Sequence, residues 1–191
     1  MWAPLALPMM GARIKIEGRE NVDVNQSYVV MANHSSYLDI PALYKALPIN
    51  LHFIAKREFK RIPFLGWYLM LSGTVLIDRK NSVKAKESLA EAANLVRKGH
   101  HVALFPEGTR STTGEIGPFK KGGFHLAHDA NVNIIPVHIK GNFDVWSRNA
   151  LFKIKPGIVT VTIGKPISPE EYNKLEMNER IEFVRRVISG L

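Results

Sequence analysis

The chain has 191 residues and a mass of 21.5 kDa, which suits one domain with a sizeable core. Cysteine is absent, and this excludes disulfides, thiolate metal sites and a cysteine nucleophile. Lysine and arginine number 26 against 17 acidic residues, a formal net charge of +9, and so basic a surface attracts nucleic acids, anionic membranes or phosphorylated small molecules. An ordinary solvated surface would also account for the charge. No zinc-finger spacing, aromatic RNA-recognition motif or Walker phosphate loop occurs, so we expect no nucleic acid partner.

The first 12 residues are uncharged and apolar, but Pro4, Pro8 and the shortness of the segment argue against a membrane span. The segment also lacks the basic leader of a signal peptide. We interpret residues 1–12 as a separate apolar segment, which could be the remnant of a membrane anchor. Residues 13–191 are predicted to form a single domain.

Short apolar runs alternate with longer helical patterns along this domain, as is typical of an α/β sheet. Between residues 78 and 100 the apolar residues recur at helical spacing, with Asn81 and Ser82 as a helix start and Gly99 just past the end. Two further helices are predicted at 120–129 and 179–188. Strand–helix–strand repeats imply crossover connections, so we expect a largely parallel sheet with function at the carboxyl ends of its strands. The predicted strands are 13–17, 28–32, 52–55, 74–78, 101–105, 133–139 and 158–163.

A histidine and an aspartate separated by four residues follow the second strand. Five positions on a helix turn through about 500°, so His34 and Asp39 would not share a face of one regular helix. If a helix instead begins near Ser36, His34 lies in the connection and Asp39 on the first turn, where its carboxylate can fold back on the imidazole. That arrangement is a general base with an orienting acid. The spacing alone is weak support, because surface and core histidines are far commoner than catalytic ones.

A second motif, Phe-Pro-Glu-Gly-Thr-Arg-Ser at 105–111, also follows an apolar run. Between the two motifs lies Gly-Thr-Val-Leu-Ile-Asp-Arg at 73–79, and Ile-Ile-Pro-Val at 134–137 comes later. With these four blocks in this order, residues 14–164 resemble the glycerolphosphate acyltransferase superfamily, most closely its bacterial members that acylate 1-acyl-glycerol 3-phosphate. The resemblance implies a single α/β domain whose central, largely parallel mixed sheet is flanked by helices.

Acyl transfer from a thioester to an alcohol requires a base for the alcohol proton and donors for the oxyanion. His34 suits the base, and Asp39 would hold its tautomer. There is no Gly-x-Ser-x-Gly nucleophile elbow, and Ser35 and Ser36 suit helix capping better than attack. We therefore favour direct attack by the acceptor hydroxyl in a ternary complex, as the resemblance also implies. The co-substrate would be an acyl-CoA or acyl carrier protein thioester, with no further cofactor.

A phosphorylated acceptor is best held by arginine side chains and free backbone amides. By resemblance, Arg79 and Arg110 bind the glycerol phosphate, and Glu107, Gly108 and Thr109 complete that site. Without the motif context, each arginine would be read as half of a surface ion pair, Arg79 with Asp78 and Arg110 with Glu115.

Two further residues match positions of the family pattern. Lys56 follows the third strand and could neutralise the thioester oxyanion or a phosphate, although a structural or membrane-surface role fits equally well. Pro136 matches a block associated with acyl binding and core structure, and a proline in mid-strand also indicates an edge strand or a bulge. His125 and His128 are three apart on a predicted helix, but no third ligand has suitable spacing, so we expect no metal.

The sequence indicates a peripheral membrane contact. Lys56, Arg57, Lys60 and Arg61 precede an uncharged run at 62–77 that contains Phe64, Trp67 and Tyr68. Its 16 residues fall short of the roughly 20 that span a bilayer, and basic residues beside aromatic ones suit a membrane interface. The alternative is an ordinary buried helix with a solvated basic rim. We expect the cytoplasmic face of the cell membrane as the location.

The favoured function is acyl transfer to lysophosphatidate to make phosphatidate for phospholipid synthesis. Glycerol 3-phosphate or another lysolipid is the alternative acceptor, because the four blocks are shared across these enzymes. A non-catalytic lipid-binding protein of the same fold, and a thioesterase in which His34 activates water, are alternatives of other classes. Acyl carrier protein could be a partner as the donor.

Overall fold

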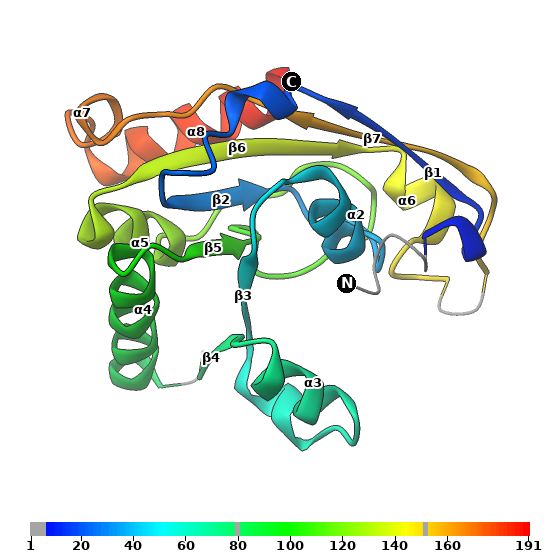
Figure 1. Cartoon of the computed structure of the whole chain (residues 1–191), viewed down its shortest axis with the longest axis horizontal. Helices are drawn as coiled ribbons and strands as arrows, with labels where there is room; N and C mark the ends of the chain where they lie inside the picture. Colours follow the sequence, from blue (N-terminus) through cyan, green and yellow to red (C-terminus); the bar gives the residue numbers. More distant parts are fainter. Residues whose placement is uncertain (1–6, 79–80, 151–152) are drawn as a thin grey trace.

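The computed structural model describes residues 7–78, 81–150 and 153–191 (Figure 1). All seven predicted strands are present, each within one residue of its predicted bounds, and they form one sheet of order β1-β7-β6-β2-β5-β3-β4. In the described ranges every neighbouring pair is parallel except β6 and β7, so the prediction of a largely parallel mixed sheet is confirmed. The strands are β1 Ala12–Glu17, β2 Tyr28–Ala32, β3 Leu51–Lys56, β4 Val75–Ile77, β5 His101–Leu104, β6 Asn133–Lys140 and β7 Gly157–Ile163.

The predicted helices are also confirmed. The first of them, α4 Ser82–Arg97, begins at Asn81, whose side chain accepts hydrogen bonds from the backbone N–H groups of Val83 and Lys84. Gly99, just past its end, takes a φ of 94°, which suits glycine. The other elements are η1 Arg19–Asn21, α2 Asp39–Ala46, η2 Arg57–Arg61, α3 Leu65–Leu71, α5 Gly122–Ala130, α6 Asn142–Trp146, α7 Pro169–Tyr172 and α8 Met177–Gly190.

Helices cover both faces of the sheet. Successive strand residues point to opposite sides, so each face has its own apolar cluster. Val30 and Ala32 pack in one buried cluster with α2, whereas Val29 and Met31 pack in a second cluster with α4, α5 and α8. The first cluster also includes Leu7, which is fully buried beside Ala12. Residues 1–6 of the apolar N-terminal segment lie outside the described residues.

Pro136 lies in β6, an interior strand, so it does not mark an edge. It lies opposite a bulge: β6 advances three residues from Ile134 to Val137, while their antiparallel partners Ile167 and Ile163 are four residues apart. The carbonyl of Pro136 accepts a hydrogen bond from Gly164 within that bulge. The nitrogen of Pro136 thus faces the one stretch where the β6–β7 ladder is interrupted, and no ladder bond is lost there.

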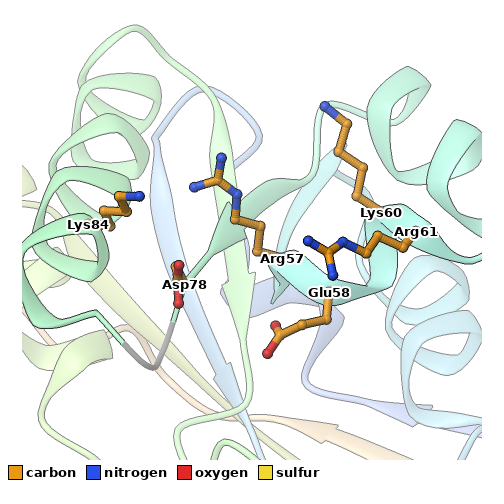
Figure 2. A pocket seen from close by; sticks show the side chains of 6 residues that line it. All are labelled: Arg57, Glu58, Lys60, Arg61, Asp78 and Lys84. Carbon is orange, nitrogen blue, oxygen red and sulfur yellow. The ribbon is translucent and has the colours of Figure 1, made fainter.

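The residues after β3 project from the body of the domain (Figure 1). The first half of β3 pairs with β5 and its second half pairs with β4, so the strand leaves the main sheet as it continues. It leads into η2 and α3, which we call the projection, residues 57–71. Within the described ranges, no helix has both the length and the hydropathy to cross a membrane. A cavity of about 700 Å³ opens between the projection and α4, lined by Arg57, Glu58, Lys60, Arg61, Asp78 and Lys84 (Figure 2).

Candidate active site

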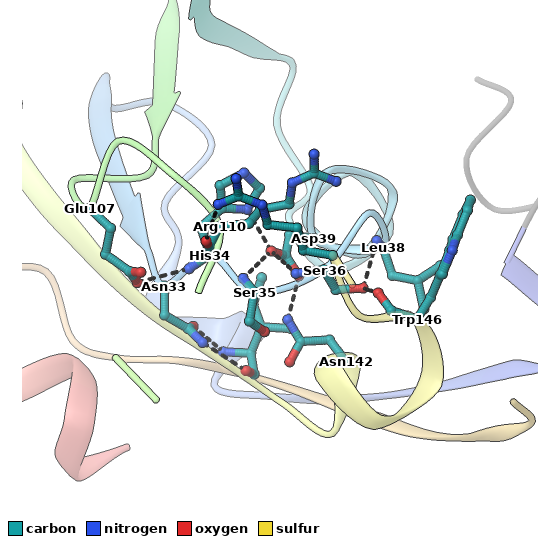
Figure 3. Close-up of polar contacts among 12 residues, drawn as sticks. Asn33, His34, Ser35, Ser36, Leu38, Asp39, Glu107, Arg110, Asn142 and Trp146 are labelled. Carbon is teal, nitrogen blue, oxygen red and sulfur yellow. Dashed lines mark hydrogen bonds and ion pairs between the residues drawn. The ribbon is translucent and has the colours of Figure 1, made fainter. Parts of the chain in front are cut away.

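The His–Asp pair forms as predicted at the carboxyl end of β2 (Figure 3). His34 lies in the connection after β2, and Asp39 is the first residue of α2. The imidazole Nδ1 lies 2.6 Å from the Asp39 Oδ2. The Asp39 carboxylate is completely buried, whereas the His34 side chain keeps 19% of its surface exposed. The base therefore faces solvent while its orienting acid does not.

Four hydrogen-bond donors converge on the Asp39 carboxylate. Oδ2 accepts from the backbone N–H groups of Ser35 and Ser36 at 2.8 and 3.0 Å, in addition to His34. Oδ1 accepts from the side-chain amide of Asn142. A carboxylate can only accept hydrogen bonds, and all four of these partners can donate one. The proton of the neutral imidazole therefore lies on Nδ1, and Nε2 is left as the basic nitrogen.

The two serines of the motif do not cap α2, so the capping interpretation is wrong: the N-cap residue of that helix is Leu38, and no side chain bonds to its first turn as a cap. The Ser36 hydroxyl accepts from the N–H of Leu38 and donates to the Trp146 carbonyl at 2.6 Å. The Ser35 hydroxyl is buried. Neither geometry presents a nucleophile beside His34, which favours direct attack by the acceptor.

The second motif holds His34 from the other side. The Phe105 ring stacks on the imidazole, with ring centroids 3.9 Å apart and an angle of 10° between the planes. Glu107 Oε1 accepts from the His34 N–H at 3.0 Å, and the Ser111 N–H donates to the His34 carbonyl at 2.7 Å. Both backbone groups of the base are thus fixed by residues 105–111, and the two motifs meet in one site as expected for neighbouring parallel strands.

Glu107 is buried beneath this loop. Burial raises the pKa of its carboxyl to about 7, against the lowering effect of hydrogen bonds from the backbone of His34 and Gly117, and the nearby Asp39 charge raises it further. Glu107 supports the base in this geometry. Its predicted contact with the acceptor phosphate stays a prediction.

Glu107→Gln should remove a pH dependence of stability. The folded state holds this proton up to a pH of about 7, and the unfolded state releases it near the ordinary glutamate pKa of 4.5. Between these values the folded state binds more protons, so the free energy of unfolding falls as the pH rises, by a few kcal/mol at most at about 1.4 kcal/mol per pKa unit. Urea unfolding at about pH 5 and pH 8 should show a smaller fall for the glutamine variant than for the wild type. Equal falls would contradict the raised pKa.

Arg110 lies at the surface of the same loop. Its guanidinium carbon is 3.7 Å from the centroid of the Tyr37 ring, a cation–π contact that holds the side chain beside the histidine motif. Arg148 donates from Nη1 to the Thr109 hydroxyl and to the Arg110 carbonyl, both at 3.1 Å. Gly108 makes the turn with a φ of 72°. The loop therefore carries one guanidinium group and is hydrogen-bonded to a second. Among the described residues, no ion pair joins Arg110 to Glu115.

The remaining predicted residues lie apart from this network. The Lys56 ammonium is 3.5 Å from Glu58 Oε1 at the end of β3. Pro136 is buried in β6 beside Met31 of β2. Arg79 lies outside the described residues. The described part of the chain contains no cluster of three metal-ligating histidine, aspartate or glutamate side chains.

Sequence reasoning missed Asn33, Asn142 and Arg148. The Asn33 side chain bridges the N–H and carbonyl of Ile139 at 2.7 and 2.9 Å, which fastens the end of β2 to the end of β6. Asn142 follows β6 by two residues. The rule that marks His34 and Glu107, a polar residue just past a parallel strand, would also have selected Asn142. Nothing in the local sequence marks Arg148.

The acyltransferase family model matches residues 13–140, and the chain belongs to that family. It is 39% identical to the 1-acyl-sn-glycerol-3-phosphate acyltransferase of Saccharomyces cerevisiae over 93% of this chain and 59% of that protein. It is 34% identical to the enzyme of the same name from Cocos nucifera, over 92% of this chain and 56% of that protein.

The solved 1-acyl-sn-glycerophosphate acyltransferase PlsC of Thermotoga maritima superposes with a TM-score of 0.85 at 29% identity, over 98% of this chain and 73% of that one. The chain spans less than three-fifths of the length of the two curated relatives above.

Proposed function

We propose that this protein transfers a fatty acyl group from a thioester to the free hydroxyl of 1-acyl-glycerol 3-phosphate, giving phosphatidate. The observation that carries the proposal is the His34–Asp39 pair, with Nδ1 bonded at 2.6 Å to a carboxylate that three further donors hold in place. Relatives named for this reaction match more than nine-tenths of the chain.

The reaction follows from the tautomer of His34. Nε2 accepts the proton of the acceptor hydroxyl while the hydroxyl oxygen attacks the thioester carbonyl. Asp39 stabilises the imidazolium that forms. The tetrahedral intermediate then expels the thiolate, which takes the proton back from Nε2. Phe105 and the backbone clamp by Glu107 and Ser111 keep the ring at one orientation throughout. Such positioned base catalysis contributes roughly 10²–10⁴ in rate.

The neighbouring arginines support a phosphorylated acceptor. Arg110 is part of the loop that clamps His34, and the Arg148 guanidinium is hydrogen-bonded to that loop. A substrate whose phosphate binds these arginines could therefore present its hydroxyl to the base. Glycerol 3-phosphate and other lysolipids present the same phosphate chemistry. Thiol release measured with acyl-CoA and acyl carrier protein donors, each with lysophosphatidate, glycerol 3-phosphate or no acceptor, identifies the donor and the acceptor together. A thioesterase would release thiol without an acceptor, and a lipid-binding protein would release none.

Arg110→Ala should lower kcat/KM for the acceptor by on the order of tenfold to a hundredfold, the loss expected for one charge-assisted hydrogen-bond donor. Arg110→Lys should recover little, because lysine lacks the planar fork. The measurement is initial rates with the acceptor concentration varied at saturating donor. The matched control is Arg186→Ala, which removes an exposed arginine from α8. An acceptor kcat/KM that Arg110→Ala leaves unchanged would remove Arg110 from the phosphate site.

We further propose that the protein works at the cytoplasmic face of the membrane as a peripheral protein. Both the proposed acceptor and the proposed product carry fatty acyl chains, and the chain has an excess of nine positive charges, which favours an anionic leaflet. Acyl carrier protein, as the alternative thioester donor, stays a possible partner in this proposal.

A further inference from the structure

The projection exposes an unusual share of the apolar surface. Eleven large apolar side chains are exposed in the described residues, and six of them lie in the projection. Exposure reaches 77% for Phe64, 62% for Trp67 and 89% for Leu71. Scattered apolar side chains are normal on a soluble protein, but a contiguous group marks an interaction site. The six are Phe59, Ile62, Phe64, Trp67, Met70 and Leu71.

The packing of α3 fixes which face is exposed. Gly66 and Leu69 are buried, and a Cβ on Gly66 would lie 2.1 Å from the Lys60 carbonyl, so α3 lies directly against η2. Tyr68 is half-buried, with a side-chain contact to Tyr44 of the body. The expectation that Tyr68 belongs to the exposed aromatic group is therefore wrong, and so is the alternative of a buried helix over Phe64 to Leu71. The outer face carries Trp67 and Leu71 and no charge.

Phe64, the residue just before α3, adopts a conformation that L-residues avoid, with φ at 63°. Such strain persists only where the surrounding structure imposes it, and it often marks functional segments. Here it turns the Phe64 ring outward against Trp67, with ring centroids 5.6 Å apart in an edge-to-face arrangement. The result is an exposed aromatic pair at the start of α3.

Basic residues border these exposed apolar residues. Arg57, Lys60 and Arg61 are exposed on η2, and across the cavity from them lies Lys84 of α4 (Figure 2). Four cationic and two acidic side chains line that cavity, so its net charge is positive. Exposed aromatic and aliphatic side chains beside arginine and lysine match the chemistry of the bilayer interface, where rings enter the acyl boundary and cations meet lipid phosphates.

We infer that the projection inserts Phe64, Trp67 and Leu71 into the interface of an anionic bilayer, with Lys60 and Arg61 on the headgroups. The projection continues from the carboxyl end of β3, and His34 and Glu107 follow the carboxyl ends of β2 and β5 at the same edge of the sheet. Docking in this way turns the catalytic edge toward the lipid. This inference adds a membrane-docking surface to the proposed function. Only the activity assays in its test rest on that function.

The binding experiment uses the full chain and sedimentation with neutral phosphatidylcholine vesicles and with vesicles containing phosphatidylglycerol, at low and high salt. Phe64→Ser/Trp67→Ser/Leu71→Ser should weaken binding at least about a hundredfold at both salt concentrations, because apolar burial resists screening. Lys60→Glu/Arg61→Glu should weaken binding to anionic vesicles on the order of thirtyfold at low salt, and much less at high salt. Trp67→Phe should still bind but lose most of the fluorescence quenching by brominated lipid.

Matched controls change equally exposed residues elsewhere. Val24→Ser/Val83→Ser/Ile158→Ser removes three exposed apolar side chains, and Lys165→Glu/Lys174→Glu reverses two exposed charges. Both should bind vesicles as the wild type does. Thermal unfolding followed by circular dichroism verifies that every variant is folded.

Activity assays separate this inference from the proposed function. Thiol release with a dispersed short-chain acceptor should be the same in the wild type and the projection variants, whereas release with vesicle-embedded acceptor should fall with binding. A wild type that binds vesicles through the projection but turns over neither acceptor would overturn the proposed function alone.

Two results would overturn the docking inference. One is vesicle binding that the projection variants retain at wild-type strength, which would assign the anchor to residues 1–10. The other is a wild-type dimer in sedimentation velocity that the serine variant converts to a monomer without a change in vesicle binding. The exposed apolar residues of the projection would then be a contact between copies of the chain.

Discussion

We expect His34→Ala to abolish the proposed acyl transfer and to leave the fold intact. The imidazole is the only group in the described site with a basic nitrogen directed away from the buried carboxylate, and its removal takes away a catalytic contribution of roughly 10²–10⁴. Stability should change little, because the ring is partly exposed and the backbone bonds to Glu107 and Ser111 do not involve the side chain. Turnover and melting temperature of the purified variant test both statements.

A matched control is His125→Ala, which removes an exposed histidine from α5 and should retain full turnover. If His34→Ala kept more than about a tenth of the wild-type turnover, the general-base role would be untenable, given the usual size of that contribution.

Asp39→Asn should lower kcat by about two to four orders of magnitude, the range for an imidazole that is no longer a base. An amide presents one acceptor oxygen where the carboxylate presents two. With its oxygen toward Ser35 and Ser36, its NH₂ group meets the amide of Asn142, donor against donor. With the amide reversed, its NH₂ donates to Nδ1, so the His34 proton moves to Nε2 and the base is lost. Stability should fall as well, by about 1–3 kcal/mol, because a buried donor is left unpaired.

Kinetics and urea unfolding of Asp39→Asn, compared with Asn142→Ala, separate the two effects. Asn142→Ala removes a donor to Oδ1 but keeps the carboxylate on Nδ1, so it should cost stability with a much smaller loss of kcat. Near-normal kcat in Asp39→Asn would show that His34 needs no carboxylate to hold its tautomer.

The sequence predicted the strands and the central pair because both depend on local order. An apolar run fixes a buried strand, and the residues just past it must lie at the edge of the sheet, so His34, Asp39 and Glu107 could be placed together. The same rule would have placed Asn142 at this edge, but it could not place Arg148 or identify the partner of either residue. Their contacts depend on β6 lying beside β2 and on the path of the chain beyond α6, and strand order in a sheet is a property of the whole fold.

The sequence was also ambiguous where the interpretation of a segment depends on what covers it in the fold. The uncharged run at 62–77 fits a buried helix and a membrane-facing one equally well, and only the packing of Gly66 on η2 shows that Trp67 points outward. Likewise, Pro136 fitted either an edge strand or a bulge, and only the strand order shows that β6 is an interior strand. Periodicity identifies an element, but it does not reveal what covers the element.

The distance along the chain between the bonded groups of the site has a consequence for biosynthesis. His34 bonds to Glu107 across 73 residues, and Asp39 bonds to Asn142 across 103. Closing such long loops is slow, and parallel pairing forms late in folding. A nascent chain that has emerged only as far as β5 has the base and its acid but leaves Oδ1 of the acid without its amide donor. The orienting half of the site is therefore completed only after β6 and α6 have left the ribosome, so His34 and Asp39 are synthesised well before the last of their hydrogen-bond donors.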